Sequence, residues 1–117
     1  MNTKTFEKLV AEAIDNLPGK FRDKMDNVNV IVENEPPEEI LRQRGLGPGD
    51  TLLGLYHGIP LSRRGRGYSS VLPDTITLYK KPIERMCSTE RQVRQQVRAV
   101  FLHELGHHFG MSERDLA

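Results

Sequence analysis

The sequence predicts an α+β fold in which a small mixed sheet of three to four strands packs on two main helices. Apolar residues recur at helical spacing over residues 3–17, short alternating segments follow in the middle of the chain, and a second helical pattern runs to about Phe109. At 117 residues the chain has the usual length of one domain with one core. We therefore interpret residues 1–117 as a single domain.

The first element is an amphipathic helix. Its apolar stripe consists of Phe6, Leu9, Val10, Ala13, Ile14 and Leu17. This is the spacing of one helix face, and Pro18-Gly19 is a typical stop signal. The stripe predicts that the helix covers a sheet.

Three strands are expected in the middle of the chain. Val28, Val30 and Val32 alternate with mostly polar residues, the period of a strand with one buried face. Residues 38–44 predict a short helical turn, and residues 51–57 and 75–79 predict the second and third strands. Between these two strands, residues 60–70 are rich in glycine, serine and arginine and predict a loop. Pro82 is expected to close the third strand.

The last element is the longest helix. Thr89 and Gln92 form a capping-box pair that starts a helix running to about Phe109. The order helix, strand, helical turn, two strands, helix is an α+β pattern.

Composition gives little indication of a charged partner. The 17 lysines and arginines nearly balance 16 acidic residues, so the net charge of +1 does not predict binding to nucleic acid or to a membrane. Arg63, Arg64 and Arg66 form a basic loop that we interpret as solvated, with binding of an acidic substrate tail or of nucleic acid as the alternative. The single Cys87 and the charged first ten residues predict a cytoplasmic protein. The sequence leaves the oligomeric state open.

The last helix carries the motif HExxH. His103 and His107 are four residues apart, so their imidazoles differ by about 40° in direction and one turn in height, which allows both to hold one ion. Glu104 projects about 100° from His103, beside the ion, where it can take a proton from a water molecule. Zinc suits this set because it accepts imidazole nitrogen and carboxylate oxygen. The motif therefore predicts a Zn²⁺ site with Glu104 as the general base.

The third metal ligand is expected after the helix. Gly110 can turn the chain back, and either Glu113 or Asp115 can then supply a carboxylate. Glu113 is preferred because it occupies the last position of the longer pattern HExxHxxGxxH, in place of histidine. Asp115 remains the alternative.

Three further polar residues near the site have weaker predictions. His108 points about 100° away from His107, which predicts a helix-surface histidine or one that supports a ligand rather than a ligand itself. Tyr56 and His57 lie on the second predicted strand. They are expected to contribute mainly to packing, with hydrogen bonding to a developing oxyanion as the alternative.

Four segments carry a family resemblance: residues 53–56, 58–61, 72–79 and, most specifically, 103–113. On these the chain resembles the zincin-like metallopeptidases, in particular a short bacterial family of minimal zincins. The resemblance implies a metal helix below an edge strand that pairs with an extended peptide. It assigns His103, His107 and Glu113 to the metal and Glu104 to catalysis.

The expected function is that of a zinc metallopeptidase, a hydrolase acting on extended or unstructured peptides. Its partner is then a peptide or unfolded protein, with neither nucleic acid nor membrane involved. The alternative is a non-catalytic zinc-binding regulatory or interaction module that retains the fold. Glu104 favours the enzyme, because metal binding alone does not need this carboxylate, whereas the small size of the chain favours the module.

Overall fold

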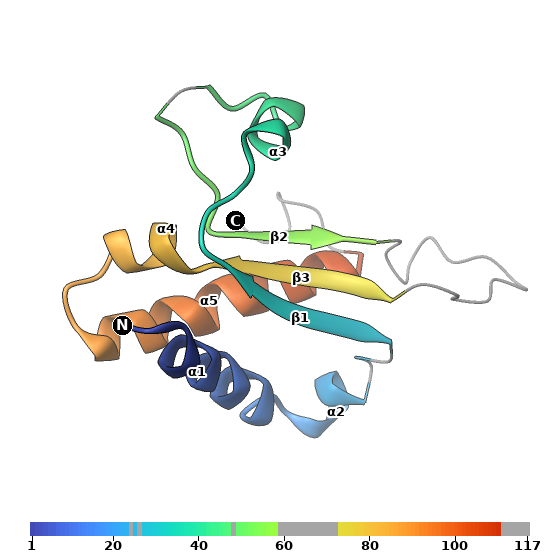
Figure 1. The fold of residues 1–117 in the computed structure, drawn as a ribbon. Coiled ribbons are helices and arrows are strands. Elements are labelled where there is room, and N and C mark those ends of the chain that lie inside the picture. Colours follow the sequence, from blue (N-terminus) through green and yellow to red (C-terminus); the bar gives the residue numbers. More distant parts are fainter. Residues whose placement is uncertain (24, 26, 48, 59–72, 111–117) are drawn as a thin grey trace, which may run out of the picture.

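The computed structural model describes residues 1–23, 25, 27–47, 49–58 and 73–110 (Figure 1). In chain order its elements are α1 (Thr3–Asp15), α2 (Gly19–Arg22), β1 (Val28–Glu33), α3 (Glu38–Gln43), β2 (Gly54–His57), β3 (Asp74–Tyr79), α4 (Lys80–Arg85) and α5 (Glu90–His108). None of the helices in these ranges is long and apolar enough to cross a membrane.

The three described strands form one mixed sheet. Their order is β1-β3-β2, with β1 parallel and β2 antiparallel to β3. The central strand β3 is therefore the last one in the sequence, and four of its residues from Ile76 to Tyr79 are all buried. β2 is an edge strand of this sheet. The small mixed sheet confirms the predicted α+β class.

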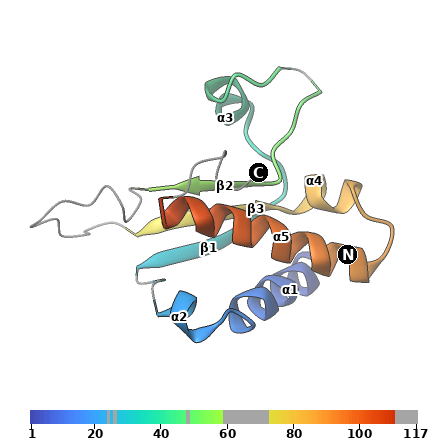
Figure 2. The same cartoon turned by 180° about the vertical axis from the view of Figure 1, so that it is seen from behind.

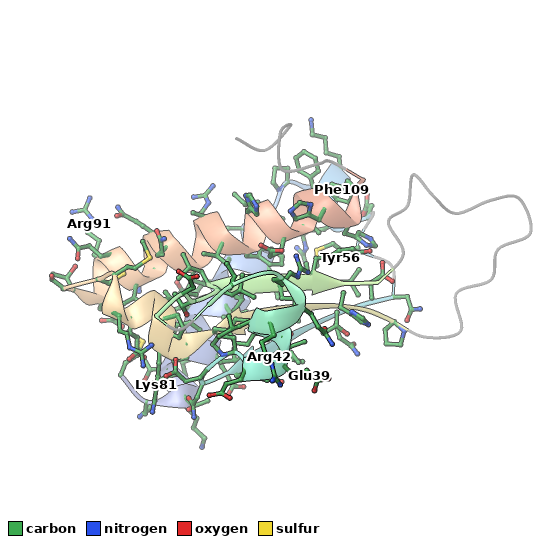
Figure 3. All side chains as sticks on the ribbon, turned by 90° about the horizontal axis from the view of Figure 1, so that it is seen from above. Glu39, Arg42, Tyr56, Lys81, Arg91 and Phe109 are labelled. Carbon is green, nitrogen blue, oxygen red and sulfur yellow. The ribbon has the colours of Figure 1, made fainter. Side chains whose placement is uncertain are left out.

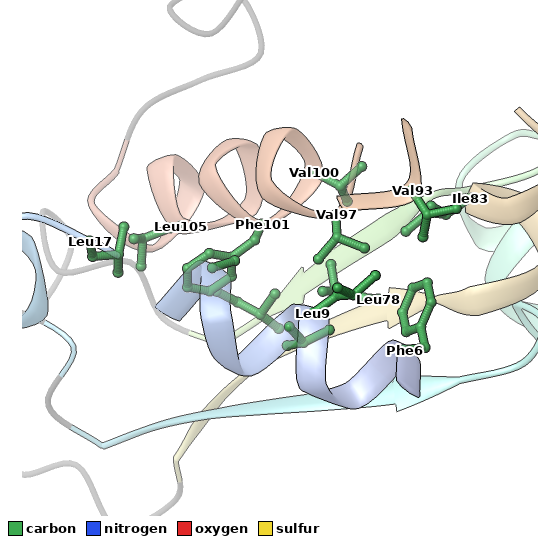
Figure 4. Close-up of a cluster of buried hydrophobic side chains, with 13 residues drawn as sticks. Phe6, Leu9, Leu17, Leu78, Ile83, Val93, Val97, Val100, Phe101 and Leu105 are labelled. Carbon is green, nitrogen blue, oxygen red and sulfur yellow. The ribbon is translucent and has the colours of Figure 1, made fainter. Parts of the chain in front are cut away.

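The two long helices, α1 and α5, cover one face of the sheet, and α3 lies on the opposite side (Figures 1 and 2). The core lies between these two helices and the sheet (Figure 4). It consists of Phe6, Leu9, Val10, Ala13, Leu17, Ile76, Leu78, Ile83, Val93, Val97, Val100, Phe101 and Leu105. Burial of these side chains fixes α5 directly under β2 and β3.

Local capping signals set the ends of the long helices. At α1, the side chain of Asn2 accepts a hydrogen bond from the Thr5 amide at 2.8 Å. At α5, Thr89 Oγ1 accepts one from the Gln92 amide at 3.1 Å, as the capping box predicts. The Gln92 side chain returns to the amide of Ser88 at 2.6 Å rather than to that of Thr89.

Two predicted breaks are wrong in detail. The first helix ends at Asp15, two residues before the predicted end at residue 17, and Pro18 precedes the short helix α2, which was not predicted. Pro82 lies inside α4 rather than closing β3. A proline fits there because amides in the first helical turn have no partner within the helix. The second strand begins at Gly54, three residues later than expected, and the predicted loop at residues 60–70 lies outside the described residues.

Candidate metal centre

Helix α5 brings His103 and His107 onto one face. Their ring centroids lie 5.1 Å apart, the planes are inclined by 78°, and both side chains are partly exposed. Two imidazoles that bind one tetrahedral zinc through nitrogens at about 2.0 Å have centroids separated by about 5 Å. The two rings thus fit a shared zinc ion in their spacing. Their partial exposure leaves a route by which a metal ion reaches them.

Glu104 lies next to this pair at the border between α5 and the edge strand. Its residue is 9% exposed, and it lines the same open groove as His103. A carboxylate placed in this way is shielded from bulk water on the sheet side but still faces the groove. This is the position in which a general base would meet a substrate held in the groove.

Gly54 allows β2 to approach α5 at this point. A Cβ atom on Gly54 would lie 2.6 Å from Val100 Cγ1, 3.2 Å from the Thr77 carbonyl oxygen and 3.3 Å from Glu104 Cγ. Any side chain here would push the edge strand away from the helix. The absence of a side chain at Gly54 therefore sets the distance between the strand edge and Glu104.

The groove beside Glu104 has a volume of about 360 Å³. It runs between α5, the first residue of β2 and the segments that precede it. Its described lining residues are Arg44, Thr51, Leu52, Leu53, Gly54, Ala99, Val100, His103 and Glu104. The groove is mostly apolar, with polar groups from the metal helix and from the residue that follows α3.

The predicted third ligands, Glu113 and Asp115, lie outside the described residues. Within the described part of the chain, no three His, Cys, Asp or Glu side chains are grouped so that they would hold a metal ion. The structure thus brings together His103, Glu104 and His107, and the choice between Glu113 and Asp115 stays a prediction.

His108 takes part in a buried hydrogen-bond network. Its Nδ1 atom lies 2.8 Å from Asp74 Oδ2, and the Tyr56 hydroxyl donates to the same oxygen at 2.6 Å. His108 is fully buried and Asp74 is 2% exposed. No partner for His108 Nε2 is present among the described residues. Of the two roles expected for His108, the helix-surface position is therefore wrong, because Asp74 gives the ring a polar partner inside the protein, and support of a metal ligand stays a prediction.

The network also decides how Tyr56 is used. Its hydroxyl points at Asp74 and lies 3.5 Å from His108 Nδ1, beside the C-terminal end of α5 where Phe109 is labelled in Figure 3. Tyr56 thus contributes to packing, as expected. His57, the last residue of β2, is exposed, and its role stays a prediction.

A family model described as zincin-like metallopeptidase matches residues 25–117, which is most of the chain. The chain belongs to the zincin-like metallopeptidase family. A conserved hypothetical protein from Thermo thermophilus has a similar fold, with a TM-score of 0.59 and 24% sequence identity over 93% of this chain and 94% of that one. A comparison with curated protein sequences gave no significant match. The match to the family model confirms the family that the resemblance implied, and the similar solved structure agrees with the implied fold.

Membership of the zincin-like family implies zinc binding in general, and the imidazole pair on α5 fits this chemistry. Two important residues of this zincin-like chain, Gly54 and Asp74, lie in segments that carry the family resemblance, but the sequence pattern assigns neither of them a role. The local pattern shows Gly54 only as part of a strand, and it does not single out Asp74. The one local signal for Asp74 is that an aspartate directly before a β-branched segment is unusual for a strand.

Proposed function

We propose that the chain is a zinc-dependent metallopeptidase that hydrolyses peptide bonds of extended or unstructured peptides. In this proposal His103, His107 and Glu113 hold Zn²⁺, with Asp115 as the alternative third ligand, and Glu104 is the general base. The observation that carries the proposal is the position of His103 and the buried Glu104 along one open groove under a strand edge, with the ring of His107 next to that of His103.

The residues of the chain divide the work of hydrolysis. Glu104 takes a proton from the attacking water and passes it to the leaving amine, which needs a carboxylate within hydrogen-bond reach of both. When bound, zinc would supply the Lewis acidity that lowers the pKa of a coordinated water toward about 7 and polarises the scissile carbonyl. His103 and His107 would hold the ion from two successive turns of α5 and so place the water and the scissile carbonyl next to Glu104.

The edge strand gives a physical reason for an extended substrate. No strand of the described residues pairs with the outer side of β2, and this supports strand addition there, in which main-chain hydrogen bonds hold a peptide in a fixed register. A folded protein does not present such a free strand, so the substrate is a peptide or an unfolded protein. The proposal involves neither nucleic acid nor a membrane. The single cysteine in the sequence supports a cytoplasmic location.

The test compares zinc content and peptide cleavage in the wild type, Glu104→Ala and His107→Ala over a mixed library of unstructured peptides. Glu90→Ala is a matched control, because Glu90 lies in the first turn of the same helix and is exposed. The wild type and the control are expected to carry about one zinc and to cleave. Glu104→Ala should keep the zinc and lose cleavage, and His107→Ala should lose both.

Other outcomes separate the two candidate functions. Zinc in the wild type without cleavage of any peptide would favour the non-catalytic zinc-binding module. Cleavage by Glu104→Ala at the wild-type rate would remove Glu104 from the mechanism. Titration of Glu113→Ala and Asp115→Ala with zinc then identifies the third ligand. Zinc affinity should fall strongly only in the variant that lacks this ligand.

A further inference from the structure

The lining of the groove includes a charged residue that the proposed mechanism does not use. Arg44 follows α3 and lines the groove together with Glu104 and His103. The apolar lining residues include Leu52, Leu53, Ala99 and Val100. The groove thus combines an apolar lining with one permanently charged cation, the arrangement of a pocket with a polar specificity group.

The guanidinium of Arg44 is available to a ligand. Two other exposed arginines form ion pairs: Arg85 binds Glu35 at 2.6 Å, and Arg94 binds Glu12 at 3.0 Å. For Arg44, no ion pair is formed with any residue that the structure describes, and its side chain is exposed. Apart from Glu104, no carboxylate belongs to the described lining of the groove. Among the described lining residues, Glu104 is therefore the one carboxylate that shares the groove with Arg44, and the proposed mechanism uses it as the general base.

The pKa of Tyr79 shows that the charge of Arg44 acts near the end of the central strand. Burial raises the pKa of the Tyr79 phenol, Glu33 raises it further, and Arg44 opposes this rise. Arg44 is thus within electrostatic range of the end of the central strand β3. The groove lies at the same end of the sheet. Its lining residue Gly54 pairs with Leu78, which is next to Tyr79.

The direction of the chain shows which part of a peptide would reach Arg44. Gly54 lies against Val100 and Glu104, whereas Tyr56 reaches His108, so β2 and α5 run the same way (Figures 1 and 2). A peptide added antiparallel to β2, the more stable pairing, runs the opposite way. Its residues after the scissile bond then pass over the segment before Gly54 and toward Arg44.

We propose that this groove binds the part of the substrate that follows the scissile bond, and that Arg44 recognises a carboxylate there. The inference rests on the peptidase function proposed above and names its substrate class. The carboxylate is either an Asp or Glu side chain or the free C-terminus of a short peptide. A guanidinium suits both because its planar donors match the two oxygens of a carboxylate.

The test uses three peptides with one common sequence: an amidated peptide with Glu after the scissile bond, the same peptide with Gln, and the Gln peptide with a free C-terminus. Each is assayed with the zinc-loaded wild type, Arg44→Gln, Arg44→Glu and the control Arg42→Gln. Arg42 lies on α3 but lines a different cavity. Peptide binding to Glu104→Gln, with and without Arg44→Gln, is measured by fluorescence anisotropy as a readout independent of cleavage.

The wild type and Arg42→Gln should prefer a carboxylate peptide by roughly fivefold in kcat/KM, the size expected for one exposed ion pair. Arg44→Gln should abolish this preference, and Arg44→Glu should reverse it. A preference for the Glu peptide identifies a side-chain carboxylate as the source, and one for the free C-terminus identifies the terminal carboxylate.

Two results overturn the inference and leave the peptidase function intact: cleavage of all three peptides at equal rates, or an acidic preference that survives in Arg44→Gln. The opposite failure is also distinguishable. Suppose that no peptide is cleaved, that Glu104→Gln binds the carboxylate peptide, and that the double variant with Arg44→Gln does not bind it. Recognition by Arg44 is then supported, and the peptidase function is contradicted. Absence of both cleavage and carboxylate-dependent binding overturns both.

Discussion

His108 Nδ1 and Asp74 Oδ2 lie 2.8 Å apart in the protein interior, where neither side chain reaches solvent to any useful extent. Asp74 is the first residue of β3, and His108 is the last residue of α5, directly after the proposed ligand His107. The pair therefore joins the end of the metal helix to the central strand. Removing Asp74 leaves the buried His108 ring without this hydrogen bond, whereas Asp74 also accepts one from Tyr56.

Asp74→Ala is expected to lower the free energy of unfolding by about 3 kcal/mol, the cost of breaking a buried polar pair from one side. Tyr56→Phe removes only the hydroxyl that donates to Asp74 and should cost about 1 kcal/mol. Urea denaturation followed by circular dichroism measures both values. Equal stability of Asp74→Ala and the wild type would show that the pair does not stabilise the fold.

Gly54→Ala should destabilise the protein by about 1–3 kcal/mol, because the new methyl group overlaps Val100 and the Thr77 carbonyl. It should also reduce cleavage, since the edge strand must move away from Glu104. Gly19→Ala is the matched control: a Cβ there meets nothing within 4 Å. Thermal melting and kcat/KM of the two variants check the prediction, which fails if Gly54→Ala behaves like Gly19→Ala.

Removal of metal should leave the chain folded. The 13 side chains of the core do not include His103, Glu104 or His107, so burial alone holds α1 and α5 on the sheet. Saturating zinc should then add about 2.7 kcal/mol at a free concentration of 100 Kd. Circular dichroism and thermal melting with EDTA and with added zinc measure this. Loss of the helical signal on chelation would instead indicate that folding requires the metal.

The Arg85–Glu35 pair predicts a pH effect away from the site. Its hydrogen bond with Arg85 lowers the pKa of Glu35 below the ordinary value of 4.5, with burial opposing. Because the folded pKa is depressed, any stabilisation by this pair is present above the unfolded pKa and is lost as the pH falls through the folded one. A carboxyl NMR titration should show Glu35 returning toward 4.5 in Arg85→Gln.

High salt offers the control for this titration. Since both side chains are exposed, added salt should reduce the shift in the wild type and change little in Arg85→Gln. A Glu35 pKa that does not respond to either change would assign its shift to another cause.

Much of this molecule was predictable from local patterns. The apolar spacing of α1, the Thr89 cap of α5 and the alternation in β1 each depend on neighbours within a few residues, and all three elements formed as expected. The HExxH spacing likewise predicted two imidazoles on one helix face, since one helical turn fixes their relative direction. The family resemblance from the same segments was also confirmed.

Only the tertiary structure decided which distant residues meet. The sequence order of the strands does not show that β3 lies in the centre, because strand pairing depends on which faces are buried together. The contacts of Asp74 with His108 and of Gly54 with Glu104 span 34 and 50 residues in the chain. No periodicity records such pairs, since they arise from the packing of a helix against a sheet.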